Sequence, residues 1–117
     1  MKKAVLVKNS SQTIYISGQL GIDPKSGNLV TCGGIQAEFR QIMENVKNIL
    51  DEAGATLSHV VKINCYMADL EEFQTMNHVY QEYLNESKPA RTTFQVGRLP
   101  LNARFVIFFL KKIKTLS

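Results

Sequence analysis

The sequence of 117 residues contains no tryptophan, three prolines, two cysteines and no long apolar run. Cys32 and Cys65 lack Cys-x-x-Cys spacing, so they predict reduced thiols rather than a disulfide framework or a metal site. The longest apolar run, Phe105–Leu110, is far shorter than the roughly 18 residues that cross a membrane. The N-terminus starts like a signal peptide, but its apolar stretch is too short for one. We therefore expect a cytoplasmic protein.

The sequence also has only a small excess of charge of one sign. The chain has 14 basic and 10 acidic residues, a net charge of +4, dispersed except for Lys111, Lys112 and Lys114. Nucleic-acid binding requires a basic stripe with stacking aromatic residues, and the sequence shows neither. We expect no membrane or nucleic-acid partner, and a single domain over residues 1–117.

Hydrophobic periodicity predicts an α+β chain in the order β-β-β-α-β-α-β-β. Gly54 is predicted to end the first helix, and Asp69 with Glu72 to begin the second. The predicted strands cover residues 4–7, 13–20, 29–31, 60–67, 91–96 and 104–113. The first helix has an apolar stripe at Ile35, Phe39, Ile42, Val46, Ile49 and Ala53, and the second at Leu70, Phe73, Met76, Tyr80, Tyr83 and Leu84. In the fourth strand Val61, Ile63, Cys65 and Met67 share one face.

Two helices can cover only one face of such a sheet. In Phe105–Leu110, however, both the odd and the even positions are apolar, which in a strand indicates burial on both faces. A lone domain would leave one apolar face in water. The pattern therefore predicts oligomerisation through the open face of the sheet.

One arginine stands out, because Pro89 fixes the backbone just before Arg91 at the start of a strand. A planar guanidinium matches a carboxylate better than a lysine does. The chain resembles the Rid family (reactive intermediate, or imine, deaminases, also called YjgF or L-PSP endoribonuclease-like) over nearly its whole length. The matching segments are Tyr15–Gln19, Asp23–Gly27, Glu44–Lys47, Ala53–Gly54, Asn77–Tyr80, Pro89–Arg91 and Val96–Pro100.

The resemblance implies a chorismate-mutase-like mixed sheet with two helices on one face. It also implies a homotrimer with its sheets packed inward and its ligand clefts between subunits. Its activity would be hydrolysis of a 2-imino or 2-enamino acid to a 2-keto acid and ammonia, without a metal or cofactor. Arg91 would be the catalytic residue that binds the substrate carboxylate, helped by a backbone amide near Gly18. The other residues expected at the substrate are Ser17, Thr93 and Asn77.

The sequence departs from the family pattern at the general base. The glutamate expected fifteen residues after Arg91 is Val106, which can neither order a water nor accept a proton. The N-terminal tyrosine of the pattern is absent, Thr93 replaces a frequent cysteine, and the loop Asn85–Lys88 is shorter and lacks an aromatic residue. A missing base typically costs roughly two to four orders of magnitude in rate.

Three functions stay open. The first is an imine deaminase, with activity weakened or lost at Val106. The second is a non-catalytic trimer that binds or senses a small carboxylate. The third, an endoribonuclease or translation inhibitor, ranks last because the sequence offers no paired acid and base for RNA cleavage.

Overall fold

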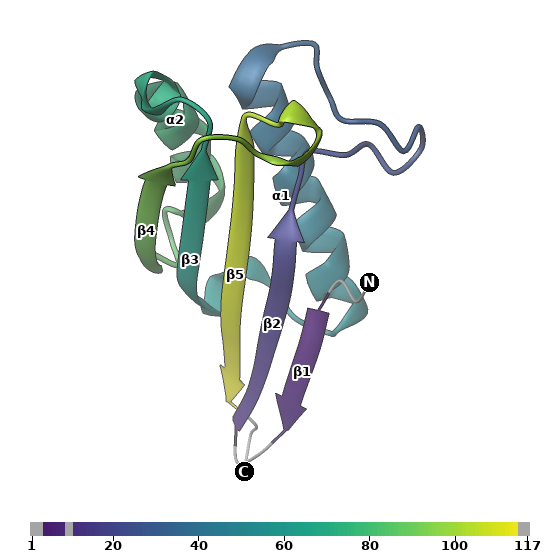
Figure 1. Ribbon diagram of the computed structural model, residues 1–117. Coiled ribbons are helices and arrows are strands. Elements are labelled where there is room, and N and C mark those ends of the chain that lie inside the picture. The colour runs from purple at the N-terminus through teal and green to yellow at the C-terminus, as the bar shows by residue number, and fades with distance from the viewer. Residues whose placement is uncertain (1–3, 9–10, 115–117) are drawn as a thin grey trace.

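The computed structural model describes the backbone of residues 4–8 and 11–114, and the side chains of residues 13–58 and 60–107. Its strands are β1 (Ala4–Lys8), β2 (Ser11–Gln19), β3 (Val60–Met67), β4 (Ala90–Gln95) and β5 (Phe105–Lys114), and its α-helices are α1 (Gly34–Glu52) and α2 (Phe73–Leu84). The strands form one mixed sheet in the order β1-β2-β5-β3-β4 (Figure 1). Only β3 and β4 pair in parallel among these neighbours. Within the chain, β1 and β4 are therefore the edges.

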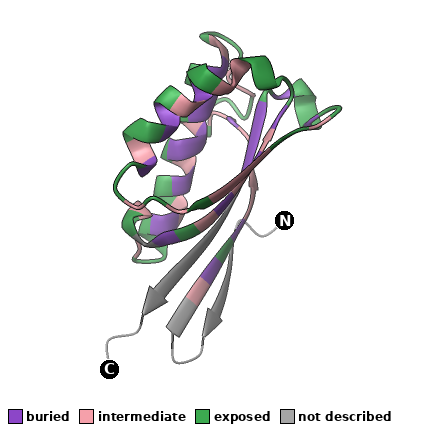
Figure 2. Cartoon of the chain, turned by 90° about the vertical axis from the view of Figure 1, so that its left-hand side faces the viewer, coloured by how far each residue is buried: buried purple, intermediate pink, exposed green. Residues whose placement is uncertain are grey.

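Both helices lie on the same face of the sheet, as the side view in Figure 2 shows. Of the predicted α1 stripe, Ile35, Phe39, Ile42 and Val46 are buried, whereas Ala53 is exposed just beyond the helix; Met43 and Leu50, which the stripe did not include, are also buried. Gly54 follows with a φ of 71°. The core between the layers includes Phe39, Ile42, Val46, Ile63, Met67, Met76, Phe105 and Ile107, each fully shielded from solvent. The predicted α+β class, with a mixed sheet and two helices on one face, is confirmed.

The predicted third strand at residues 29–31 is wrong. Leu29 makes only an isolated antiparallel bridge to Ile22, around a turn in which Gly27 has a φ of 74°. The chain then turns at Gly33 and Gly34, whose φ values are 98° and 69°, directly into α1. Because the helix begins so soon, too little chain remains to form a strand.

Two residues predicted to lie on apolar faces of their elements are exposed instead. The pairing of β3 with β5 shifts register between Val60 and Lys62, so Val60 enters the core and Val61 is 43% exposed. Leu70, also 43% exposed, lies in a short 3-10 turn in which the carboxylate of Asp69 accepts a hydrogen bond from the amide of Glu71. The helix α2 therefore starts later than predicted, at Phe73.

The face of the sheet away from the helices is partly apolar. Val106 alternates with the helix-facing Phe105 and Ile107, so the expectation of a strand apolar on both faces holds over these three residues. The side chains of residues 108–110 lie outside the described part. Tyr15 and Phe94, on the same open face, are 50% and 54% exposed.

A buried carboxylate connects α1 to the start of β5. Glu38 is 2% exposed, and its Oε1 accepts hydrogen bonds from the amides of Arg104 (2.8 Å) and Phe105 (3.3 Å). Burial raises the pKa of Glu38, while the two amide hydrogen bonds pull it down. Gly21 packs against the backbone of the same helix turn. The contact fixes where β5 enters the sheet.

Candidate functional site

Arg91 lies near the start of the edge strand β4, on the face that the helices cover. It pairs in register with Ile63 of β3, whose side chain is buried in the core. Paired residues of neighbouring strands point to the same face, so the Arg91 side chain extends beneath α2. The edge position leaves the residue partly accessible to solvent.

Three residues of α2 hold the guanidinium. Its Nη1 donates a hydrogen bond to Oδ1 of Asn77 at 2.6 Å. Its carbon lies 4.3 Å from the ring centroid of Tyr80 and 5.4 Å from that of Phe73. The positions 73, 77 and 80 recur at helical spacing and therefore share one face of α2.

No carboxylate neutralises Arg91 among the described residues. The ion pairs in that part of the chain join Arg40 to Glu82, Lys47 to Glu44 and Arg104 to Glu72. Asn77 is neutral, and the two aromatic rings attract a cation through their faces without cancelling its charge. The arginine is thus held in place while its charge remains available to an anion.

Thr93 and Cys65 continue the helix-facing surface beside Arg91. They pair in register, and Thr93 Oγ1 is buried without a hydrogen-bond partner within the described residues. Burial raises the pKa of the Cys65 thiol to about 12, although the charge of Arg91 and the neighbouring Thr93 hydroxyl pull it down. The thiol is therefore protonated at neutral pH and is a poor nucleophile.

A pocket of about 450 Å³ opens at Arg91, between the end of α2 and the start of β4. That volume is within the range of small-molecule sites. Its lining consists of Tyr80, Gln81, Leu84, Asn85, Lys88, Pro89 and Arg91. The pocket therefore combines cationic, amide and apolar groups.

Ser17 and Gly18 lie elsewhere in the chain. The pairing of β2 with β5 shifts register between Ile16 and Gln19, which places Ser17 and Gly18 in a β-bulge. Gly18 lines a separate pocket of about 440 Å³ beside α1. Three strand spacings separate β2 from β4 in the sheet order, or roughly 14 Å. One chain does not bring Gly18 to Arg91.

Val106 lies on the opposite face of the sheet from Arg91. It pairs with Tyr66 and is 6% exposed, in a small cluster with Leu99 and Ala103. A single chain therefore unites Arg91, Asn77 and Thr93, but not Gly18 or Val106. A site that uses all of these residues requires more than one chain.

Sequence reasoning missed the role of the two aromatic residues. Phe73 and Tyr80 were assigned to the apolar stripe of the second helix, and the structure shows that they also face the guanidinium. Their spacing of four and three residues from Asn77 carried the signal, because it places all three on one helix face.

The described residues include no group of three His, Cys, Asp or Glu side chains arranged to hold a metal ion. No helix in the same part of the chain is both long and apolar enough to cross a membrane. His78 is exposed on α2, and the side chain of His59 lies outside the described part.

The fold agrees with the family relationships of the sequence. The profile of the family described as Endoribonuclease L-PSP matches residues 3–109. The chain therefore belongs to this family, as the Rid resemblance predicted. The human 2-iminobutanoate/2-iminopropanoate deaminase is 44% identical over 105 residues, which cover 90% of this chain and 74% of that protein.

Solved structures show the same relationship. RidA from an Antarctic Psychrobacter superposes with a TM-score of 0.87 at 39% identity, covering 97% of this chain and 88% of that one. E. coli TdcF, solved with bound serine, has a TM-score of 0.81 at 29% identity, covering 94% of this chain and 86% of that one. The fold and the family are thus shared with proteins of the Rid type.

Proposed function

We propose that this protein is a Rid-type deaminase that binds the carboxylate of a small 2-imino acid at Arg91. The observation that supports this best is the guanidinium held by Asn77, Tyr80 and Phe73 without an ion pair to any carboxylate in the described part of the chain. A planar guanidinium can donate two parallel hydrogen bonds to a carboxylate. The human relative is named as a deaminase of 2-imino acids. TdcF was solved with serine, an amino acid that carries a carboxylate group.

The complete site is proposed to form between subunits of a homotrimer. The chain separates Arg91 from the bulge at Gly18 by two intervening strands, and it buries Val106 on the other face. The open face also exposes Tyr15 and Phe94, which an inward-packed sheet would cover. Sedimentation equilibrium should therefore give three times the chain mass, and a stable monomer at micromolar concentration would contradict this assembly.

In the proposed reaction, water adds to the carbon of the C=N bond, and the adduct releases ammonia to leave a 2-keto acid. The carbon of a protonated imine is already electrophilic, so positioning and one base are enough. Val106 supplies no base, and its side chain is buried among apolar neighbours. We infer slow turnover, in which Arg91 orients the substrate and unassisted water completes the hydrolysis.

The test couples the protein to a dehydratase that releases 2-iminobutanoate and follows decay of the imine. Arg91→Lys keeps the charge but loses the planar fork, so both acceleration of decay and binding of 2-ketobutyrate should fall sharply. Lys47→Met, on the exposed side of α1, serves as the control and should behave as wild type. Equal ligand affinity in wild type and Arg91→Lys would place the carboxylate elsewhere.

A second candidate function is a trimer that binds a small carboxylate without turnover, and the apolar environment of Val106 favours it. Val106→Glu separates the two candidates once folding and assembly have been checked, because a charge in this cluster costs stability. Increased imine hydrolysis in this variant would support a deaminase site that lacks only its base. A folded, trimeric Val106→Glu protein without activity would favour the binding function.

A further inference from the structure

The pocket at Arg91 contains a second cation. Lys88 lines the same space of about 450 Å³, three residues before Arg91. Like Arg91, it makes no ion pair with any residue in the described part of the chain. Two basic side chains therefore share one pocket without an internal counter-charge.

The backbone conformation around Lys88 determines where its side chain begins. Its amide donates a hydrogen bond to the carbonyl of Leu84 at the end of α2, at 3.1 Å. Its φ of 43° is left-handed, and the next residue, Pro89, has its own φ fixed by the pyrrolidine ring. Three residues span at most about 11 Å, so Lys88 and Arg91 start close together on the two sides of a rigid proline.

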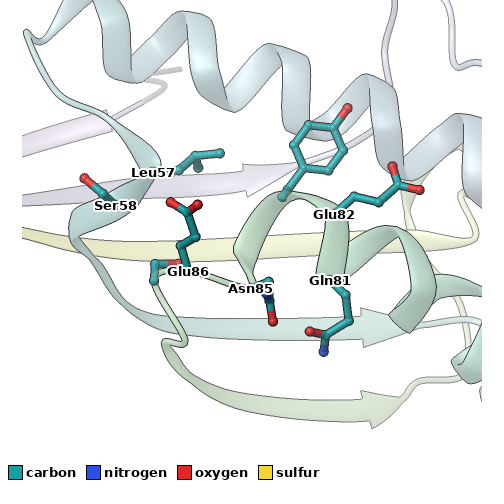
Figure 3. A pocket seen from close by; sticks show the side chains of 8 residues that line it. Leu57, Ser58, Gln81, Glu82, Asn85 and Glu86 are labelled. Atoms are coloured by element: carbon teal, nitrogen blue, oxygen red, sulfur yellow. The ribbon is translucent and has the colours of Figure 1, made fainter.

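The remaining polar side chains of the pocket are neutral: the amides of Gln81 and Asn85 and the phenol of Tyr80. Two acidic side chains, Glu82 and Glu86, line a different pocket, of about 370 Å³, at the end of α2. Figure 3 shows the side chain of Glu86 extending toward Leu57 and Ser58, whereas those of Gln81 and Asn85 extend the other way. Glu82, in that second pocket, is already paired with Arg40 at 2.7 Å. No acidic residue lines the pocket that holds Lys88 and Arg91.

We propose that this pocket selects a substrate with two carboxylates, a 2-imino dicarboxylic acid or the corresponding 2-keto acid. Arg91 would bind the carboxylate beside the reacting carbon, and Lys88 would bind the distal one. This inference rests on the proposed function, because it assigns the substrate class of the same site. Lys88 is a specificity residue and takes no part in the addition of water.

The experiment compares 2-ketoglutarate with 2-ketobutyrate, two 2-keto acids of which only the first has a distal carboxylate. Affinities are measured by NMR titration for wild type, Lys88→Met, Lys88→Glu and the control Lys47→Met. Lys88 is exposed, so its ion pair is worth no more than about fivefold in affinity at low salt. We expect wild type and Lys47→Met to prefer 2-ketoglutarate by about that factor.

Lys88→Met should abolish the preference by weakening the binding of 2-ketoglutarate more than that of 2-ketobutyrate, and Lys88→Glu should reverse it. Arg91→Lys should weaken both ligands. If wild type shows no preference, or if Lys88→Met retains it, the dicarboxylate inference is wrong, while Arg91-dependent binding of 2-ketobutyrate would leave the proposed function standing. Loss of Arg91 dependence for both ligands would overturn the proposed function and this inference together.

Discussion

Replacement of Gly21 by alanine tests how closely α1 packs on the segment that follows β2. A Cβ added at Gly21 would lie 2.6 Å from the backbone oxygen of Glu38 and 2.8 Å from its Cγ. The first of these atoms is backbone and cannot rotate away, so the helix itself must move. Forcing extra volume into a packed site costs about 1–3 kcal/mol. Scaled to 117 residues, the entropy of unfolding is about 0.25 kcal/mol per degree, so Tm should fall by about 4–12 °C.

Gly97→Ala is the matched control, because a Cβ there meets no atom within 4 Å and its φ is not left-handed. Thermal unfolding is followed by circular dichroism at one protein concentration, since assembly would make Tm concentration-dependent. Gly97→Ala should retain or slightly raise Tm. If both variants unfold within about one degree of wild type, α1 does not approach Gly21 as closely as the structure shows, and the packing argument fails.

Three further predictions concern individual side chains. Tyr80→Phe should keep the affinity for 2-ketobutyrate, because the Tyr80 ring, and not its hydroxyl, faces the Arg91 guanidinium. Tyr80→Leu removes the ring and should lower this affinity about twofold to fivefold. Equal loss of affinity in both variants would implicate the hydroxyl. Thr93→Val should raise the free energy of unfolding by about 1 kcal/mol, because Thr93 Oγ1 is buried without a hydrogen-bond partner among the described residues; destabilisation in urea melts would show that the hydroxyl bonds to a neighbour such as Cys65. Burial raises the pKa of Glu38 above 4.5, so the folded chain binds this proton more tightly than the unfolded one. The resulting stability is present below pH 4.5 and is lost as pH rises through the folded pKa. The unfolding free energy of wild type minus that of Glu38→Gln should therefore fall from pH 4 to pH 7, and a flat difference would rule out this titration.

Much of the fold could be predicted because its signals are local. The stripe of α1 repeats over five turns, and Gly54 supplies a left-handed residue just after it. The errors arose where pairing between distant strands decides the outcome. The register between β3 and β5 shifts at Val61, and this shift exposes the Val61 side chain. The alternation of residues 60–67 contains no information about the register with a strand that lies far along the chain.

The candidate site was predictable in part for the same reason. Arg91 was recognised from its chemistry and its neighbouring proline, and Asn77 from the resemblance, and the structure places the two in contact. The sequence could not show that Val106 and Arg91 occupy opposite faces, because that depends on the register of β3 with both β4 and β5. The sequence did not point to Lys88, because the role proposed for it depends on the shape of a pocket.

Within the residues of one chain that the structure describes, β4 pairs on one side only, with β3. An edge strand opens at a lower free energy than a central one, so its amides exchange with deuterium faster than those of β3. Because Arg91 connects β4 to α2 through Asn77, a bound carboxylate would add a second attachment for the strand. Slower exchange in residues 90–95 on adding ligand would thus report occupancy of the site even in a variant that performs no chemistry.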